Sequence, residues 1–249
     1  MVKIPVPISG GKDSQTCLEL AIELVGVGHV QGLFCDTKFE HPLTYEHIDF
    51  IRDHYRVQID VVNAGNVPDK VRKYGRFPGG GARFCTDELK IKPTVIYAKA
   101  LATAQGGFEI WYGMRSDEST DRAARYKDRV SDELYTPHEY MAGKYPKYLA
   151  RMGVMVRLPI LDWSKHQVLH QLQDRANPLY AAGFDRVGCF PCFASGDVHK
   201  ERAFGFDKFG KQQKVIALQL EREIGKSIWT SQGGSQRNNP DQMCMICQS

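Results

Sequence analysis

The feature that most limits the fold is a six-residue string, Ser9-Gly10-Gly11-Lys12-Asp13-Ser14, near the start of the chain. Residues 3–8 before it have the apolar character of a strand, and residues 15–25 after it have helical spacing. Two glycines let an anion approach the backbone N–H groups of such a turn, the helix N-terminus favours negative charge, and Lys12 adds a cation. The string therefore predicts a phosphate site, although its spacing is not that of a Walker loop. A capped glycine turn without a ligand is the alternative.

Strands and helices alternate through the first two-thirds of the chain. Strands are predicted over residues 29–35, 58–62 and 108–113, helices over residues 43–54 and 86–104 with Thr86 as N-cap, and a loop over residues 63–83. This order predicts an α/β fold with a mainly parallel sheet covered by helices on both faces. Ligands of such sheets bind beyond the carboxyl ends of the strands, which is where the six-residue string lies.

Length, composition and charge limit the size of the fold and the kinds of partner that the chain can bind. The length of 249 residues suffices for one α/β domain with an appendage, and a hydrophobic content of 42% supports a substantial core. We predict a nucleotide-binding domain over residues 1–205 and a helix with a Cys-containing tail over residues 206–249. The net charge of +4 is compatible with nucleic acid without demonstrating it. No apolar run reaches the ~20 residues of a membrane span and no signal peptide is visible, so a cytoplasmic location without membrane partners is expected.

Polar residues follow two other predicted strands. Asp36 and Thr37 follow the second strand, where a carboxylate and a hydroxyl can meet a nucleotide or its Mg²⁺; helix capping ahead of Pro42 is the alternative. Gly113 and Arg115 follow the fourth strand, and a guanidinium can clamp a phosphate through two hydrogen bonds. An arginine on a surface turn is otherwise simply solvated.

Seven cysteines in a chain with no sign of secretion favour metal or redox chemistry over disulfides. Cys17 and Cys35 fall on a predicted helix and a predicted strand, and burial as small hydrophobic residues is expected for both. Cys189 and Cys192 form a C-x-x-C pair, which can hold a metal ion or an iron–sulfur cluster from one turn. The further candidate ligands are Cys85, Cys244 and Cys247, of which the last two form a second C-x-x-C pair.

Five motifs occur in one order along residues 3–205. They are Ser9 to Ser14, Asp36-Thr37 with the following Pro42, Cys85 with Lys90 and Pro93, Gly113-x-Arg115-x-x-Glu118-Ser119, and Asn177-Pro-Leu-Tyr-x-x-Gly-Phe with Cys189-x-x-Cys192. Together they resemble the phosphoadenosine phosphosulfate (PAPS) reductase-like branch of the PP-loop superfamily. The resemblance is closest in kind to the ATP pyrophosphatase/sulfurtransferases of DNA phosphorothioation systems. It implies a flavodoxin-like adenine nucleotide alpha-hydrolase fold.

The same resemblance implies roles for individual residues. Phosphates of ATP are expected on Ser9, Gly10, Gly11, Lys12, Asp13 and Ser14, the adenosine beside Asp36 and Thr37, and the phosphate end near Gly113 and Arg115. Lys12, Asp13 and Arg115 are the expected catalytic residues, with Mg²⁺ as the companion ion.

The resemblance also implies a [4Fe–4S] cluster, which relatives hold with a Cys-Cys pair and a later C-x-x-C. Cys85 matches the first cysteine of that pair, whereas Thr86 stands at the second position. Cys189 and Cys192 match the later pair, so three of four ligands are present. The fourth is Cys244, Cys247, a non-cysteine group or an open iron site. A structural Zn²⁺ held by Cys189, Cys192, Cys244 and Cys247 is the alternative.

Two reactions suit these features. In the first, ATP adenylates an acceptor, pyrophosphate leaves, and sulfur then displaces AMP; a cysteine desulfurase is the expected donor, and DNA and other modification-complex subunits are the expected partners. The alternative is a thiol-dependent reductase of a sulfonucleotide (APS or PAPS), although residues 242–249 lack the Glu-Cys-Gly motif of such enzymes. A non-catalytic nucleotide-binding module is the third reading. The basic and aromatic residues 122–147 either follow a phosphate backbone or form a solvated face.

Overall fold

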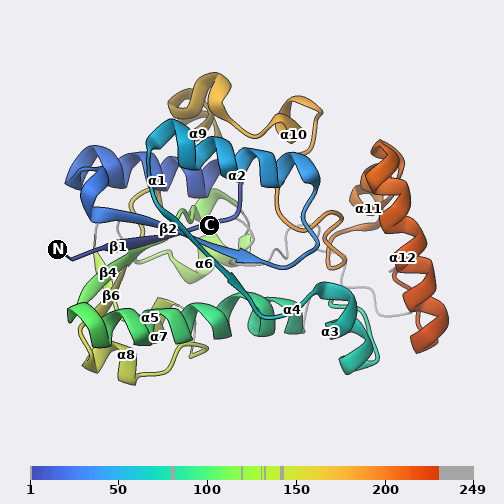
Figure 1. Ribbon diagram of the computed structural model, residues 1–249, viewed down its shortest axis with the longest axis horizontal. Coiled ribbons are helices and arrows are strands. Elements are labelled where there is room, and N and C mark those ends of the chain that lie inside the picture. Colours follow the sequence, from blue (N-terminus) through green and yellow to red (C-terminus); the bar gives the residue numbers. More distant parts are fainter. Residues whose placement is uncertain are drawn as a thin grey trace.

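Parallel strands with helices on both faces organise the computed structural model, as the sequence predicted (Figure 1). It describes residues 2–79, 82–118, 120–129, 131, 133–140 and 143–229. The first ladder contains β1 (Ile4–Ile8), β2 (Val30–Asp36) and β3 (Ile59–Asn63), all parallel, with Val6 opposite Gly32 and Phe34 opposite Val61. The second contains β4 (Phe108–Trp111) parallel to β6 (Val154–Arg157), and β5 (Leu134–Tyr135) antiparallel to β6.

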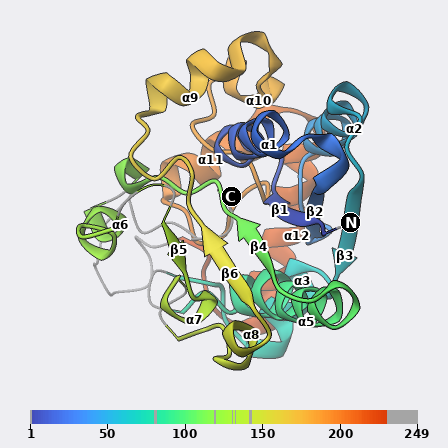
Figure 2. The same ribbon diagram turned by 90° about the vertical axis from the view of Figure 1, so that its left-hand side faces the viewer.

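The two ladders lie edge to edge, with β1 beside β4 (Figure 2). Pro5 and Pro7 of β1 have no backbone N–H, and because they are two residues apart they remove donors from one edge of the strand. β1 therefore keeps its ladder with β2, and within the described residues no ladder joins it to β4. The prolines thus mark the seam of the sheet.

Helices cover both faces of this sheet (Figure 1). One face carries α1 (Lys12–Val25), α2 (Pro42–Tyr55), α9 (Lys165–Leu172) and α10 (Pro178–Ala181). The other carries α5 (Lys92–Gln105), α7 (Pro137–Tyr140) and α8 (Tyr148–Arg151), and α6 (Thr120–Arg125) lies beyond β5 (Figure 2). Local signals start two of these helices: Ser164 and Gln167 form a capping box at α9, and Pro42 fits the first turn of α2.

The prediction of a loop over residues 63–83 was wrong, because α3 (Val67–Tyr74) lies within it. Asn66 caps this helix by accepting a hydrogen bond from the Asp69 N–H over 2.8 Å, and Gly75 ends it in the left-handed conformation. Val67 and Val71, four residues apart, bury its apolar side. The cap, the spacing and the terminal glycine are a complete helix signal within only eight residues.

Thr86 is not an N-cap, because it has helical torsion angles and the helix begins before it. α4 (Phe84–Thr86) continues through a π-helical turn, Asp87–Ile91, into α5. Pro93 cannot donate a hydrogen bond to the carbonyl four residues earlier, which accounts for the wider turn at this point. The turn carries Lys90, which is 5% exposed.

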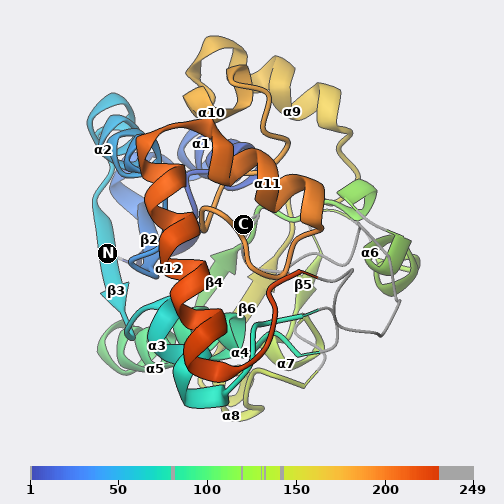
Figure 3. The ribbon, with the colours of Figure 1, turned by 90° about the vertical axis from the view of Figure 1, so that its right-hand side faces the viewer.

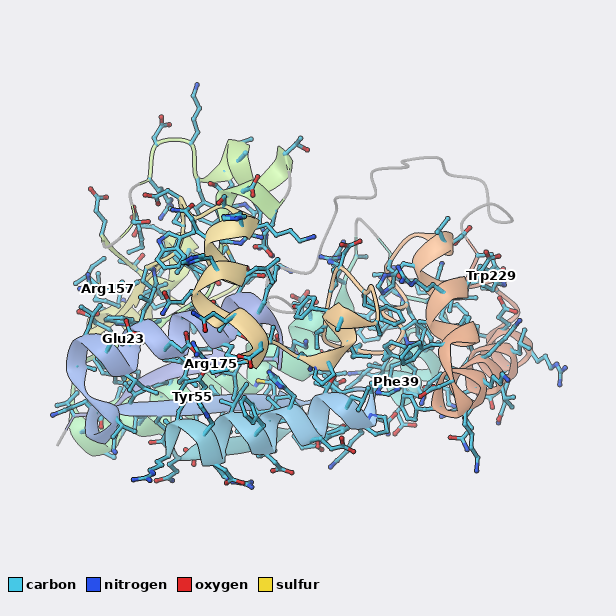
Figure 4. All side chains as sticks on the ribbon, turned by 90° about the horizontal axis from the view of Figure 1, so that it is seen from above. Glu23, Phe39, Tyr55, Arg157, Arg175 and Trp229 are labelled. Carbon is cyan, nitrogen blue, oxygen red and sulfur yellow. The ribbon has the colours of Figure 1, made fainter. Side chains whose placement is uncertain are left out.

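Apolar side chains fill both sides of the sheet. Val6, Leu18 and Ile51 are fully buried between β1, α1 and α2, and each contributes about 1.5–3 kcal/mol by leaving water. Polar side chains also connect the helices of this layer. Tyr55 and Arg175, labelled in Figure 4, both donate a hydrogen bond to the Glu19 carboxylate on α1. The opposite layer holds three buried tyrosines, Tyr112, Tyr140 and Tyr145.

A helical hairpin of α11 (Asp197–Phe206) and α12 (Lys208–Ile224) lies across the end of the molecule where β1 and β2 finish (Figure 3). His41 Nε2 lies 3.0 Å from Asp207 Oδ2, and Asp207 caps α12 through the Gly210 N–H. Phe39 and Trp229, labelled in Figure 4, belong to the apolar cluster beneath the hairpin. The domain boundary predicted at residue 205 falls inside α11 and stays a prediction. Across the described part of the chain, every helix is too short or too polar to span a bilayer.

Candidate functional site

The six-residue string connects β1 to α1, as predicted, and stands at the carboxyl end of the first strand. Gly10 has a φ of +73°, and a Cβ there would stand 2.8 Å from the Thr44 methyl group. Gly11 is the N-cap of α1. Two hydrogen bonds of Ser14 stabilise the turn. Its Oγ donates to the Gly11 carbonyl over 2.9 Å and accepts from the Ser9 N–H over 3.3 Å. The glycines therefore serve a close backbone turn at a helix N-terminus, a geometry suited to anions.

Behind this turn lies a buried group of three charged side chains. Lys12 Nζ lies 2.5 Å from Asp13 Oδ2, and Arg115 Nε lies 2.6 Å from Asp13 Oδ1. None of the three is more than 4% exposed. Burial lowers the pKa of Lys12, opposed by the Asp13 carboxylate beside it. Both cations stand at the N-terminus of α1, where the helix dipole and the free N–H groups also favour an anionic ligand.

Arg115 is held by the chain on both sides of the seam. Its Nη1 donates to the Trp163 carbonyl over 3.2 Å and to Asp117 Oδ2 over 3.1 Å. Gly113, two residues earlier, was predicted to contact the nucleotide, and the structure gives it a packing position. A Cβ at Gly113 would stand 2.3 Å from the Asp13 carbonyl oxygen, so only glycine lets the end of β4 approach α1 this closely.

Asp36 and Thr37 stand at the carboxyl end of β2, but neither caps a helix. His41 caps α2 instead, through its Nδ1 and the Leu43 N–H. Asp36 accepts hydrogen bonds from the Lys38 N–H and the Tyr45 hydroxyl, each over 2.8 Å. The alternative of capping by Asp36 or Thr37 is therefore set aside.

Thr37 faces a carboxylate that the sequence did not single out. Its Oγ1 donates to Glu40 Oε1 over 2.6 Å and lies 3.3 Å from Cys189 Sγ. Glu40 is 3% exposed and pairs with Cys189 in an isolated backbone bridge. Thr37 and Glu40 thus join the loop after β2 to the C-x-x-C turn.

Two neighbouring pockets open beside these groups. One is bordered by Ser9 of the phosphate turn, by the ends of β1 and β2, and by Glu40 and Lys90. The other is bordered by Thr37, Lys90 and the three cysteines Cys85, Cys189 and Cys192. Lys90 lines both pockets and so lies between Ser9 of the turn and the three thiols.

The cysteines divide as the sequence predicted, with Cys17 and Cys35 buried. Cys85, Cys189 and Cys192 line one pocket although a hundred residues separate the first from the others. In the described ranges, no three Cys, His, Asp or Glu side chains form a group that could hold a single metal ion. A cluster binds each thiolate to a different iron and tolerates wider spacing, so the three thiols fit a cluster by donor chemistry. Cys244 and Cys247, and the Zn²⁺ alternative that needs them, lie outside the described residues.

Several residues of the site escaped the sequence analysis. Lys90 was noted only as part of a motif with Pro93, and its burial on a π-helical turn was not predicted. Tyr180 likewise belongs to a noted motif, and its hydroxyl accepts a hydrogen bond from the Lys12 N–H over 2.9 Å. Lys165, at the start of α9, acts electrostatically on Lys12. Each comes from a segment remote in sequence, so no local pattern could reveal it.

The parallel sheet with this turn at a strand end defines an α/β protein of the adenine nucleotide alpha-hydrolase fold. The sequence model described as the phosphoadenosine phosphosulfate reductase domain matches residues 3–195, and the chain belongs to that family. A PAPS reductase of Candida auris in complex with phosphate superposes with a TM-score of 0.51 at 14% identity, covering 77% of this chain and 83% of that one. At this identity, the superposition supports the fold alone.

Two relatives show how far the sequence similarity extends. An uncharacterized protein of Methanocaldococcus jannaschii is 30% identical over 239 residues, which cover 93% of this chain and 45% of that protein. The phosphoadenosine 5'-phosphosulfate reductase of Erwinia tasmaniensis is 26% identical over 198 residues, covering 78% of this chain and 68% of the reductase. The chain thus spans less than half the length of the first relative.

Proposed function

We propose that this chain is a PP-loop ATP pyrophosphatase that activates an acceptor by adenylation for sulfur transfer. The observation that supports this most directly is that the two pockets have a lining residue, Lys90, in common. Lys90 borders both the pocket beside the phosphate turn and the pocket of Cys85, Cys189 and Cys192. A reaction that activates an oxygen with ATP and then replaces it with sulfur needs the phosphate site and the thiols side by side.

The charged residues have distinct parts in this reaction. An acceptor oxygen attacks the α-phosphorus of ATP, the bond to the β-phosphate oxygen breaks, and pyrophosphate leaves with its electron pair. Lys12 and the N–H groups of the turn hold the pyrophosphate, while Arg115 and Lys165 supply further positive charge nearby. Asp13 orients both Lys12 and Arg115, because its two carboxylate oxygens each bond one of them. Mg²⁺ is the proposed companion of the triphosphate.

The thiols supply the second half of the reaction. Cys85, Cys189 and Cys192 are the residues that would hold a [4Fe–4S] cluster, and when bound it would supply sulfur-transfer chemistry. Thr37 lies between Cys189 and Glu40 and so positions this thiol relative to the nucleotide pocket. Sulfur at the oxidation level of sulfide attacks the adenylated acceptor and AMP leaves, so a donor is needed, and a thiol reductant supplies two electrons where the donor carries a persulfide. A cysteine desulfurase is the proposed donor, DNA the proposed acceptor, and phosphorothioate modification by a larger complex the proposed setting.

The second candidate is a thiol-dependent reductase of APS or PAPS. Membership of the PAPS reductase domain family and the relative named as a PAPS reductase favour it. In that reaction the turn holds the phosphates of a sulfonucleotide, and a thiolate attacks its sulfur. The two candidates differ in the bond broken, since one cleaves a P–O bond of ATP and the other reduces a sulfonucleotide to sulfite.

The test is to incubate the anaerobically purified protein with ATP labelled at the α-phosphate or, in parallel, at the γ-phosphate, together with Mg²⁺, sulfide and DNA, and to separate the labelled products. AMP with equimolar pyrophosphate is expected, whereas ADP would contradict the proposal. Lys12→Ala should remove the activity while the protein stays folded, and Lys211→Ala, on the exposed side of α12, is the matched control. Thioredoxin-dependent sulfite release from APS or PAPS, without AMP formation from ATP, would instead establish the reductase.

A further inference from the structure

The hydroxyl of Tyr180 lies against the backbone of the phosphate turn. It accepts a hydrogen bond from the Lys12 N–H over 2.9 Å, although 168 residues separate the two in sequence. The Lys12 ammonium group lies 5.7 Å from the centre of the Tyr180 ring. A Cβ added to Gly11 would stand 3.4 Å from the same hydroxyl. Tyr180 thus lies directly against the first residues of α1.

The N–H of Lys12 is one of the groups that a phosphate would use. The first N–H groups of a helix have no partner within it, and they are the donors that helix N-termini offer to phosphates. Lys12 is the first residue of α1, so its N–H belongs to this set. The tyrosine hydroxyl therefore stands where an oxygen of the ligand is expected to bind.

Tyr180 is held in this place by the short helix that carries it. Asn177 caps α10 by accepting from the Leu179 N–H over 3.0 Å, and its Nδ2 donates to the Gly10 carbonyl over 3.2 Å. Asn177 is 1% exposed, so this junction is buried. Burial, with the Asp13 carboxylate nearby, raises the pKa of Tyr180, so the hydroxyl is neutral at physiological pH. The turn and α10 form one unit that presents a neutral acceptor to the Lys12 N–H.

We propose that Tyr180 is a positioning residue that stands in for a phosphate oxygen at the Lys12 N–H and must release this donor when a nucleotide binds. The inference rests on the proposed function, because it takes the turn to be a phosphate site. The hydrogen bond stabilises the turn, and every ligand that takes the N–H has to replace it. Tyr180 therefore lowers the affinity for the pyrophosphate group while it keeps the turn ordered.

Tyr180→Phe separates these two effects. The variant should bind pyrophosphate and α,β-methylene-ATP about 2- to 10-fold more tightly by titration calorimetry, the range that one ordinary hydrogen bond accounts for. Its melting temperature without ligand should fall. Tyr97→Phe is the matched control, since the Tyr97 hydroxyl bonds Asp60 over 2.8 Å far from the turn. That control should lose stability without a change in affinity. Unchanged or weaker binding by Tyr180→Phe overturns the inference.

A second measurement needs no variant. In the ligand-free wild-type protein, the amide of Lys12 should be protected from hydrogen exchange, because the tyrosine hydroxyl holds it. An amide of Lys12 that exchanges at the rate of an open turn overturns the inference even if Tyr180→Phe fails to fold. A wild-type protein that binds neither ligand contradicts the proposed function itself. The two failures are therefore distinguishable.

Discussion

Arg115 donates from its Nε to Asp13 Oδ1 over 2.6 Å, although 102 residues separate the two side chains. This bond joins the segment after β4 to the first turn of α1, across the seam where, among the residues that the structure describes, no ladder connects β1 with β4. The same carboxylate bonds Lys12 through its other oxygen. The pairing therefore stabilises the junction of the two ladders and sets the positions of both cations behind the phosphate turn.

Replacing Arg115 should damage stability and activity together. Arg115→Ala breaks a buried ion pair and is expected to cost about 3 kcal/mol in free energy of unfolding, measured by urea denaturation. Arg115→Lys keeps the charge but loses the planar arrangement of donors that bonds Asp13, Asp117 and the Trp163 carbonyl, so AMP formation should fall at least about tenfold. Arg151→Ala, at an exposed position on α8, should change neither quantity. Full activity of Arg115→Lys would contradict the positioning role of this side chain.

Gly113→Ala should separate the end of β4 from α1. The new Cβ would stand 2.3 Å from the Asp13 carbonyl oxygen, and neither backbone segment can move aside without displacing the phosphate turn. We expect a loss of about 3 kcal/mol in unfolding free energy and weaker nucleotide binding, by denaturation and calorimetry. Gly205→Ala is the matched control, since nothing lies within 4 Å of a Cβ there and alanine favours the helix. Equal stability of the two variants would mean that the close approach is not required.

Removing any one thiol of the shared pocket should reduce bound iron. Anaerobically purified wild-type protein is expected to be brown and to contain about four iron atoms and four sulfides per chain. Cys85→Ala, Cys189→Ala and Cys192→Ala should each lower both contents, because all three side chains line the pocket. Cys17→Ala is the control, since that thiol is fully buried away from the pocket. A colourless wild-type protein that contains zinc instead would refute the cluster.

Acid should destabilise the protein through His47. Burial lowers the pKa of His47 to about 4, and its Nε2 lies 2.8 Å from Gln15 Oε1 on α1. The unfolded chain titrates near pH 6.5, so between that pH and about 4 only the unfolded state takes up the proton. The contribution of His47 to the free energy of unfolding is therefore fully present above pH 6.5, and it is about 2 kcal/mol smaller at pH 5.

The measurement is the free energy of unfolding at pH 7 and pH 5. His47→Gln should reduce the difference between the two values, whereas His54→Gln, an exposed histidine on the same helix, should leave it as in the wild type. An unchanged pH dependence in His47→Gln would assign the effect to other groups.

The sequence alone determined the alternation of strands and helices, the turn of Ser9 to Ser14, and the separation of buried from pocket-lining cysteines. Each rests on residues close together in the chain, whose spacing or chemistry acts locally. α3 carries an equally local signal, Asn66 with Gly75, so its omission was an error of interpretation. The π-helical turn that places Lys90 precedes Pro93, but a proline there is also compatible with the start of a new helix, so the sequence did not predict the turn.

Only the tertiary structure decided which of these residues meet. Three contacts join segments far apart in sequence. Asp13 pairs with Arg115, Tyr180 accepts from the Lys12 N–H, and Lys90 lines two pockets. Such contacts depend on how β1 and β4, which belong to different ladders in the described part of the chain, lie against each other, and on how closely Gly113 lets β4 approach α1. Packing of this kind is set by the shapes of many side chains at once, and no local pattern encodes it.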